Sequence, residues 1–134
     1  MVCVYCGGKT RVFNSRPLFR SNQVWRRRIC NECKAVFTTV EGHDPAQTWL
    51  VKSSNQSSTN FIREKLFLSI YESLKHRPTA LLDAKHLTQT VINKLGAATK
   101  SGAIDASSIT STVIVSLNRF DKIAGTHYKA FHSS

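Results

Sequence analysis

The chain has 134 residues, of which 41% are hydrophobic, and a formal net charge of +11 from 19 basic and 8 acidic side chains. This length fits one ordinary domain, or two small ones if something other than an apolar core stabilises the smaller. No apolar run approaches the roughly 18 residues that span a bilayer, and cysteines stand where a signal peptide would be apolar. We therefore expect a cytoplasmic protein without a membrane partner. The charge favours a nucleic acid as partner, with a basic but otherwise ordinary soluble protein as the alternative.

The first 42 residues combine four cysteines with short runs of strand-forming residues. Three segments alternate β-branched or aromatic residues with polar ones: 10–14, 23–29 and 35–41. Turn-forming residues stand between these segments. The pattern predicts a small three-stranded β-meander with too few large apolar residues to bury a sizeable core.

Glycine, aspartate and proline in residues 42–47 indicate a linker. The expected domains are therefore 1–46 and 47–134. Residues 48–52 are typical of a strand. The serine-rich segment 53–60 is either a flexible tip or a turn followed by a second, polar strand.

From residue 61 the spacing of apolar residues changes to the helical period. The pattern predicts four amphipathic helices, which begin near Asn60 as N-cap, near Asp83, near Ser107 or Ser108, and after Asp121. Gly125 is expected to weaken the last helix by about 1 kcal/mol relative to alanine. Short connections between such helices predict a bundle, so the expected fold class is α+β, a small cysteine-bearing β-meander followed by short strands and four helices.

The cysteines form two Cys-x2-Cys pairs, Cys3 with Cys6 and Cys30 with Cys33. Two such pairs allow four thiolates to surround one ion, and a site filled by four sulfurs is structural zinc rather than catalytic zinc. A thioredoxin-like redox pair would need a βαβ pattern that the sequence lacks, and an iron–sulfur cluster is a further alternative. A segment this short takes its folding free energy from the metal, which leaves its arginines free to project.

Three consecutive arginines, Arg26, Arg27 and Arg28, lie on a predicted strand. Side chains alternate along a strand, so Arg26 and Arg28 are expected on one face and Arg27 on the other. Trp25 and Phe37 offer flat surfaces for bases or guanidinium groups. This cluster predicts a nucleic-acid contact. The alternative is a solvated basic strand with Trp25 packed over the zinc site.

Several motifs in their order resemble those of the NrdR family of bacterial transcriptional regulators: "CVYCGGKTRVFNSRP", "VWRRRICNECKAVFTTVE", "VKSS", "REKL" and "HRPT". The resemblance covers essentially the whole chain and is most specific in residues 3–41. It implies a zinc ribbon followed by an ATP-cone, a small helical bundle capped by strands that binds ATP or dATP. It further implies repression of ribonucleotide reductase genes by a homo-oligomer that binds operator boxes in double-stranded DNA when loaded with dATP.

The resemblance also implies functional residues. The zinc ligands would be Cys3, Cys6, Cys30 and Cys33. The DNA contacts would be Arg16, Arg26, Arg27, Arg28, Thr38 and Thr39. The nucleotide contacts would be Val51, Lys52 and Lys65, where two lysines can converge on a triphosphate.

The chain departs from the family pattern mainly in the cone. Ser53 replaces a basic residue, Ser58, Thr59 and Asn60 replace an Arg-Glu-Pro, and His127 stands where an arginine is expected. One alternative is therefore a DNA-binding protein whose cone only oligomerises. A second is a zinc ribbon that docks on RNA polymerase or ribosomal RNA. An enzyme is not expected, because a zinc ion closed by four cysteines does not activate water.

Overall fold

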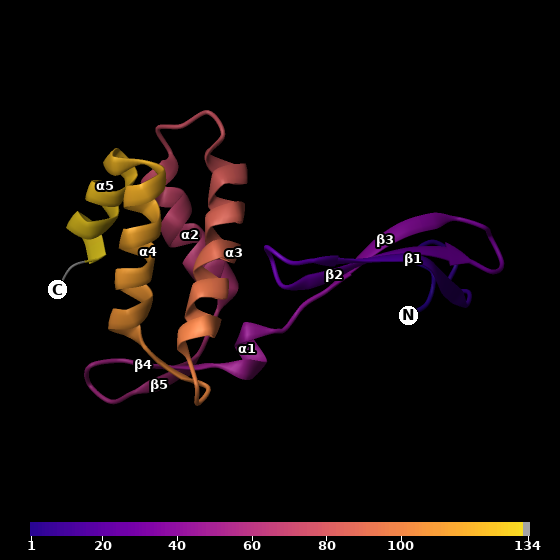
Figure 1. The fold of residues 1–134 in the computed structure, drawn as a ribbon, viewed down its shortest axis with the longest axis horizontal. Coiled ribbons are helices and arrows are strands. Elements are labelled where there is room, and N and C mark those ends of the chain that lie inside the picture. The colour runs from indigo at the N-terminus through magenta and orange to yellow at the C-terminus, as the bar shows by residue number, and fades with distance from the viewer. Residues whose placement is uncertain (133–134) are drawn as a thin grey trace. The chain divides into compact units, whose positions relative to one another are not determined.

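The computed structural model describes residues 1–132, which divide into two compact units, Met1–His43 and a second unit that begins at Asp44 (Figure 1). The first unit is built from strands, and the second has four long helices and a small sheet. The predicted α+β fold class, with an N-terminal β-meander and a helical C-terminal part, is confirmed.

The first unit is an antiparallel sheet in the order β1-β2-β3, formed by Thr10–Leu18, Gln23–Cys30 and Val36–Glu41. The register shifts between Val12 and Asn14, which face Arg28 and Arg27 respectively. Phe13 is therefore an extra residue in β1, a β-bulge, and the pairing continues beyond it to the end of the β1–β2 hairpin.

The apolar core of this unit is very small. It consists of Cys3, Cys30 and Phe37, with Ala35 packed against them. A core of this size cannot stabilise a sheet of three strands, so the unit depends on what its cysteines bind.

The second unit opens with a short helix, α1 (Pro45–Thr48), which Asp44 caps by accepting a hydrogen bond from the Ala46 amide. The boundary between the units lies within the expected linker 42–47, but its second half is helical, because Asp44 is a cap and Pro45 is compatible with the first position of a helix. The strand β4 (Leu50–Lys52) then pairs antiparallel with β5 (Ser58–Asn60) and parallel with β6 (Ala103–Asp105). The serine-rich segment therefore forms a turn and a second strand.

Four helices follow: α2 (Arg63–Leu74), α3 (Ala80–Ala98), α4 (Ala106–Phe120) and α5 (Lys122–His132). They run side by side with the small sheet at one end (Figure 1). The cap of the first long helix lies two residues later than predicted, because Asn60 ends β5 and Ile62 occupies the cap position. No helix within residues 1–132 is long and apolar enough to cross a membrane.

The core of the second unit is continuous from the sheet through the bundle. Its largest fully buried side chains are Ile70, Leu74, Ile92, Leu117, Val91 and Val113. Trp49 and Phe61 close the sheet end of this core with an edge-to-face ring contact, their centroids 5.4 Å apart. Ile123 and Phe131 of α5 are exposed and lie outside this core.

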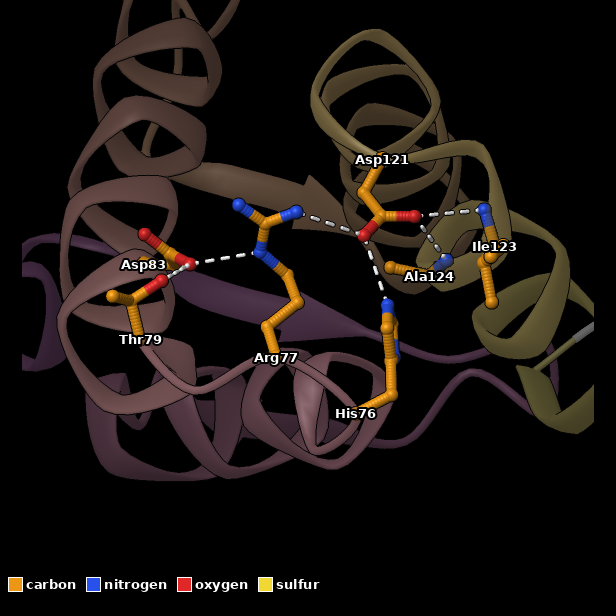
Figure 2. A network of polar contacts seen from close by, with 7 residues as sticks. All are labelled: His76, Arg77, Thr79, Asp83, Asp121, Ile123 and Ala124. Carbon is orange, nitrogen blue, oxygen red and sulfur yellow. Dashed lines mark hydrogen bonds and ion pairs between the residues drawn. The ribbon is translucent and has the colours of Figure 1, made fainter.

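A polar network joins the connection between α2 and α3 to the start of α5 (Figure 2). The Asp121 Oδ2 atom accepts a hydrogen bond from Arg77 Nη1 (3.1 Å) and lies 2.9 Å from His76 Nε2. Arg77 Nε donates to Asp83 Oδ2 at 2.9 Å. The other Asp121 oxygen caps α5 by accepting from the Ile123 amide (2.9 Å). These bonds hold the pKa of Asp121 down at about 2, with His76 the largest cause.

Candidate functional site

The four cysteines of the first unit bring their sulfur atoms together. All four Sγ atoms lie within 4.8 Å of one another, with Cys3 and Cys33 3.7 Å apart and Cys6 and Cys30 3.5 Å apart. A disulfide would need about 2.05 Å, whereas tetrahedral zinc with bonds of about 2.3 Å places its sulfurs about 3.8 Å apart. The four cysteines are therefore positioned to bind one zinc ion with every coordination position filled by sulfur.

Backbone amides support negative charge on these sulfurs. The amides of Cys33 and Glu32 both donate to Cys30 Sγ at 3.4 Å and, against desolvation, lower the pKa of that thiol to about 6. The Gly8 amide acts likewise on Cys6, but hydrogen bonds with Cys30 and Cys33 raise the pKa of Cys6 to about 12. Four neighbouring thiols cannot all ionise alone, and a divalent cation supplies the charge that allows them to.

Each cysteine pair is followed by a residue in the left-handed backbone region. Gly7 has φ +75° and Lys34 has φ +63°. The two turns therefore share one backbone geometry although only the first has the residue that adopts it without strain. A sequence comparison of the two turns would miss this symmetry.

One face of the sheet carries a set of exposed cationic groups around an aromatic ring. Side chains at every second position of β2 share a face, which puts Trp25, Arg27 and Ile29 together. The residues paired with them lie on the same face: Arg16 opposite Trp25, Thr38 opposite Arg27 and Arg11 opposite Ile29. The Arg16 guanidinium lies 5.3 Å from the centroid of the Trp25 ring, and Arg27 Nη1 donates to Thr38 Oγ1 at 3.0 Å. We call this set, Arg11, Arg16, Trp25, Arg27 and Thr38, the tryptophan face.

The opposite face holds Arg26 and Arg28, and both have partners within the protein. Arg26 Nη1 forms an ion pair with Glu41 Oε1 at 2.5 Å, and Arg28 Nε donates to Thr39 Oγ1 at 3.2 Å. We call this set, Arg26, Arg28, Thr39 and Glu41, the glutamate face. The expected alternation of the three arginines is present, and it divides the six residues assigned to DNA equally between two faces.

Two further expectations about this sheet can be compared with the structure. Phe37 is only 9% exposed and packs in the cysteine core, so the expectation that bases could stack on it is wrong. Trp25 is half-buried on the tryptophan face and is not part of that core. The alternative that Trp25 packs over the zinc site is therefore also wrong.

The second unit has two adjoining cavities at the sheet end of the bundle. The first, of about 430 Å³, is lined by Lys52, the serine-rich turn, Asp105 and the first turns of α4. The second, of about 320 Å³, is lined by Val51, Phe61, Lys65, Ile109 and Tyr128. Ala106, Thr110 and His132 line both cavities. The structure thus gathers Val51, Lys52 and Lys65 around the N-terminus of α4, with Lys52 in one cavity and the other two in its neighbour.

The two cavities differ in the residues that line them. Ser53, Ser54, Ser107, Thr110 and Ser111 bring hydroxyl groups to the first, and α4 begins there without a side-chain cap on its amides. Val51, Phe61, Ile62, Leu66, Ile109 and Tyr128 bring apolar and aromatic side chains to the second. Together they can receive a ligand with an anionic end and a flat, largely apolar end.

Sequence reasoning missed the contributions of α4, α5 and β6 to these cavities. Ala106, Thr110 and His132 come from parts of the chain far from Val51 in sequence. The strand β6 has three residues and a parallel pairing with β4, so it leaves no alternating pattern to detect. The one available signal was the serine-rich start of the third predicted helix.

Comparison with known proteins gives a consistent result. Residues 1–41 match the family described as "Transcriptional repressor NrdR-like, N-terminal domain". A curated protein of Rhodospirillum centenum named "Transcriptional repressor NrdR" is 35% identical over 98% of this chain and 85% of its own length. Proteins of the same name are 33% identical in Neorickettsia sennetsu (92% of this chain, 83% of the relative) and 27% identical in Fervidobacterium nodosum (98% and 86%).

Proposed function

Because the chain belongs to the NrdR family of transcriptional repressors, we propose that it represses ribonucleotide reductase genes by binding operator boxes in double-stranded DNA. Its oligomeric state, and through it operator binding, is controlled by ATP and dATP in the second unit. The DNA-binding domain is the first unit, Met1–His43, and the nucleotide-binding and oligomerisation domain is the second, so the expected boundary after residue 46 moves to His43. The protein acts in the cytoplasm at the nucleoid and catalyses no reaction.

The observation that carries this proposal is the charge of the β1–β2 hairpin. Between Thr10 and Cys30 the chain has six arginines and no acidic residue. The hairpin is part of a sheet held by a four-cysteine site, which fixes the arginines on a rigid support. A two-stranded ribbon fits the major groove of DNA, and arginine binds both phosphate and guanine through two hydrogen bonds.

The tryptophan face is the side that meets the duplex. Within residues 1–132, the partners of Arg16 and Arg27 are the Trp25 ring and the Thr38 hydroxyl, and neither partner compensates their charge. On the glutamate face Arg26 is neutralised by Glu41. Arg16, Arg27 and Thr38 are therefore the main DNA contacts, and Arg26 contributes less. Arg28 donates only to the uncharged Thr39 hydroxyl and keeps its charge, but it is half-buried and shares its face with Glu41, so Arg28 and Thr39 are secondary contacts.

The two cavities of the second unit support the nucleotide part of the proposal. The triphosphate would lie in the hydroxyl-rich cavity, where Lys52 and the amides at the start of α4 offer positive charge. The adenine would lie against Val51, Phe61 and Ile109 in the neighbouring cavity, with Lys65 at its edge. A nucleotide that favours one oligomer would then set the spacing of the DNA-binding units.

A second candidate function is supported by the first cavity itself. The carboxylate of Asp105 lines it and would repel a triphosphate. The serine-rich turn 53–57 has no cationic side chain to bind phosphate, and its Ser53 and Ser57 hydroxyls bond to each other at 2.6 Å. This candidate is a zinc-ribbon protein that binds DNA or RNA polymerase. Its helical second unit binds no nucleotide and serves only for oligomerisation.

The test of DNA binding uses the zinc-loaded full-length chain to select duplexes from a random library. Enrichment of one sequence that binds more tightly than its scrambled version is the expected result. Binding of all duplexes alike, or binding of RNA polymerase without any duplex preference, would favour a docking protein instead.

The test of nucleotide control is calorimetric titration of ATP and dATP into the same protein, with light scattering to follow its oligomeric state. Micromolar binding that changes the oligomer is expected. Lys52→Ala should abolish the heat, whereas Lys100→Ala, a lysine that lines neither cavity, should leave it unchanged. If the folded protein gives no heat at millimolar nucleotide, the result favours the second candidate function, in which the second unit only oligomerises.

A further inference from the structure

The tip of the β1–β2 hairpin exposes a phenylalanine that takes no part in the fold. Phe19 is 87% exposed, more than any other large hydrophobic residue in the part of the chain that the structure describes. It follows Leu18, the last paired residue of β1, whose partner across the hairpin is Gln23. A single exposed apolar residue on a protein surface is common and by itself indicates nothing.

The surroundings of Phe19 distinguish it from other exposed apolar residues. It stands at the end of a hairpin with six arginines and no carboxylate, and Arg20 is its neighbour. The tryptophan face runs toward the same end, because Arg16 and Trp25 lie two pairs before Leu18 and Gln23. A polyanion attracted to this face therefore comes close to the ring of Phe19.

The backbone holds the tip without help from this ring. The Asn22 amide donates to the Phe19 carbonyl (3.4 Å), and the Ser21 hydroxyl donates to the Leu18 carbonyl (3.4 Å). Asn22 supplies the left-handed conformation of the turn, with φ +53°. Removing the Phe19 ring should leave the turn and the sheet intact.

We propose that Phe19 is a base-contacting residue, whose ring enters a groove of the duplex bound by the tryptophan face and touches base edges or a base step. The proposal rests on the proposed DNA-binding function. Phosphates are met by the arginines, but an uncharged ring gains free energy only where it leaves water, which in a duplex means against bases. Proteins use exposed apolar side chains in this way, either against thymine methyl groups or as wedges between base pairs.

The test measures affinity for the duplex selected by the zinc-loaded wild-type chain, as a function of salt concentration. Phe19→Ala should weaken binding about tenfold at every salt concentration, because base contacts by aromatic rings have this magnitude. The slope of log affinity against log salt should not change, because the ring carries no charge and releases no counterions. Affinity for a scrambled duplex should fall less.

Tyr5→Ala is the matched control, since Tyr5 is 72% exposed on the same unit but lies outside the hairpin. It should bind the selected duplex like the wild type. Zinc content is measured for both variants, and Phe19→Ser replaces Phe19→Ala if the latter does not retain its metal.

Three results would overturn the proposal. Equal affinity of wild type and Phe19→Ala excludes a base contact. A reduced salt slope shows that the tip acts through charge. Loss of the oligomer with unchanged affinity per DNA-binding unit shows that Phe19 packs on protein. A wild-type chain that enriches no duplex at all would instead overturn the proposed function together with this inference.

Discussion

Gly125 of α5 packs directly against Asn118 of α4. A Cβ atom built on Gly125 would lie 2.7 Å from the Asn118 Cγ atom and 3.1 Å from the backbone of the same residue. Gly125 is buried, and α4 and α5 are antiparallel neighbours joined by a single residue, Asp121. The missing side chain is therefore what allows the two helices to approach.

Gly125→Ala should destabilise the second unit, although alanine is the better helix former by about 1 kcal/mol. Overpacking a close contact costs about 1–3 kcal/mol, which exceeds the gain in helix propensity. Urea denaturation followed by circular dichroism measures the change. Asn118→Ala in the same chain should recover only part of the loss, because the backbone of residue 118 still lies close to the added methyl group. A stabilised Gly125→Ala variant would show that α5 can move away from α4 at no cost.

The sequence predicts elements that rest on local patterns and misses those that rest on distant partners. The three ribbon strands and the four long helices follow from alternation and from the helical period. The role of Gly125 does not, because its cause is Asn118 on another helix. The same holds for β6, whose parallel partner β4 lies about fifty residues earlier in the chain.

Asp121 should make the second unit sensitive to acid. Its pKa is about 2 in the folded protein, below the usual value near 3.9 of an unfolded chain. The carboxylate therefore stabilises the fold at pH values above about 4, and this contribution is lost as the pH falls toward 2. Urea denaturation between pH 5 and pH 2 measures it, in a Trp25→Phe background where Trp49 fluorescence reports on the second unit alone.

Two variants separate the roles of the two Asp121 oxygens. Asp121→Asn can still cap α5, but it cannot accept hydrogen bonds from both His76 and Arg77. The variant should therefore be less stable than the wild type at pH 7, and its stability should depend less on pH. Asp121→Ala also loses the cap and should cost about 1 kcal/mol more. Acid sensitivity that is identical in wild type and Asp121→Asn would assign it to another carboxylate.

Removing the metal should unfold the first unit and leave the second folded. The apolar core of the first unit is limited to Cys3, Cys30 and Phe37, so coordination supplies its folding free energy. Chelation, or Cys30→Ser, should change the fluorescence of Trp25, abolish duplex binding and leave the cooperative unfolding of the bundle in place. A metal-free chain that still binds the selected duplex at moderate salt would contradict this dependence.

A substitution in the turn after the second cysteine pair should increase the zinc affinity. Lys34 has φ +63°, which costs an L residue about 1 kcal/mol, whereas Gly7 adopts φ +75° in the equivalent turn without that cost. Lys34→Gly should therefore raise zinc affinity by about fivefold, because folding and metal binding are coupled in this unit. Gly7→Ala should lower the affinity by a similar factor, since nothing but the backbone opposes a Cβ there. Zinc competition with a chromophoric chelator measures both, and equal affinities for all three chains would show that the turns carry no strain.

In the candidate sites too, features set by residues close in sequence are predicted, and features set by residues far apart in sequence are not. The cysteine spacing predicts the metal site because each pair lies in one tight turn. The arginine cluster predicts a nucleic-acid contact, and alternation predicts the face of each arginine, but the compensation of the Arg26 charge depends on Glu41 of the neighbouring strand. The cavities near Lys52 and Lys65 depend still more on distant residues, because α4 and α5 complete them.

The two faces of the ribbon should differ in their contribution to DNA binding. Arg27→Ala should weaken binding of the selected duplex and reduce the salt slope by about one, as expected for one phosphate contact. Arg26→Ala should have a smaller effect on both, because Glu41 already compensates its charge. Glu41→Gln is the informative partner variant, since it frees Arg26 and should increase both the affinity and the salt slope. Fluorescence anisotropy at a series of salt concentrations measures all three, and equal slopes for Arg26→Ala and Arg27→Ala would mean that both faces of the hairpin lie against the duplex.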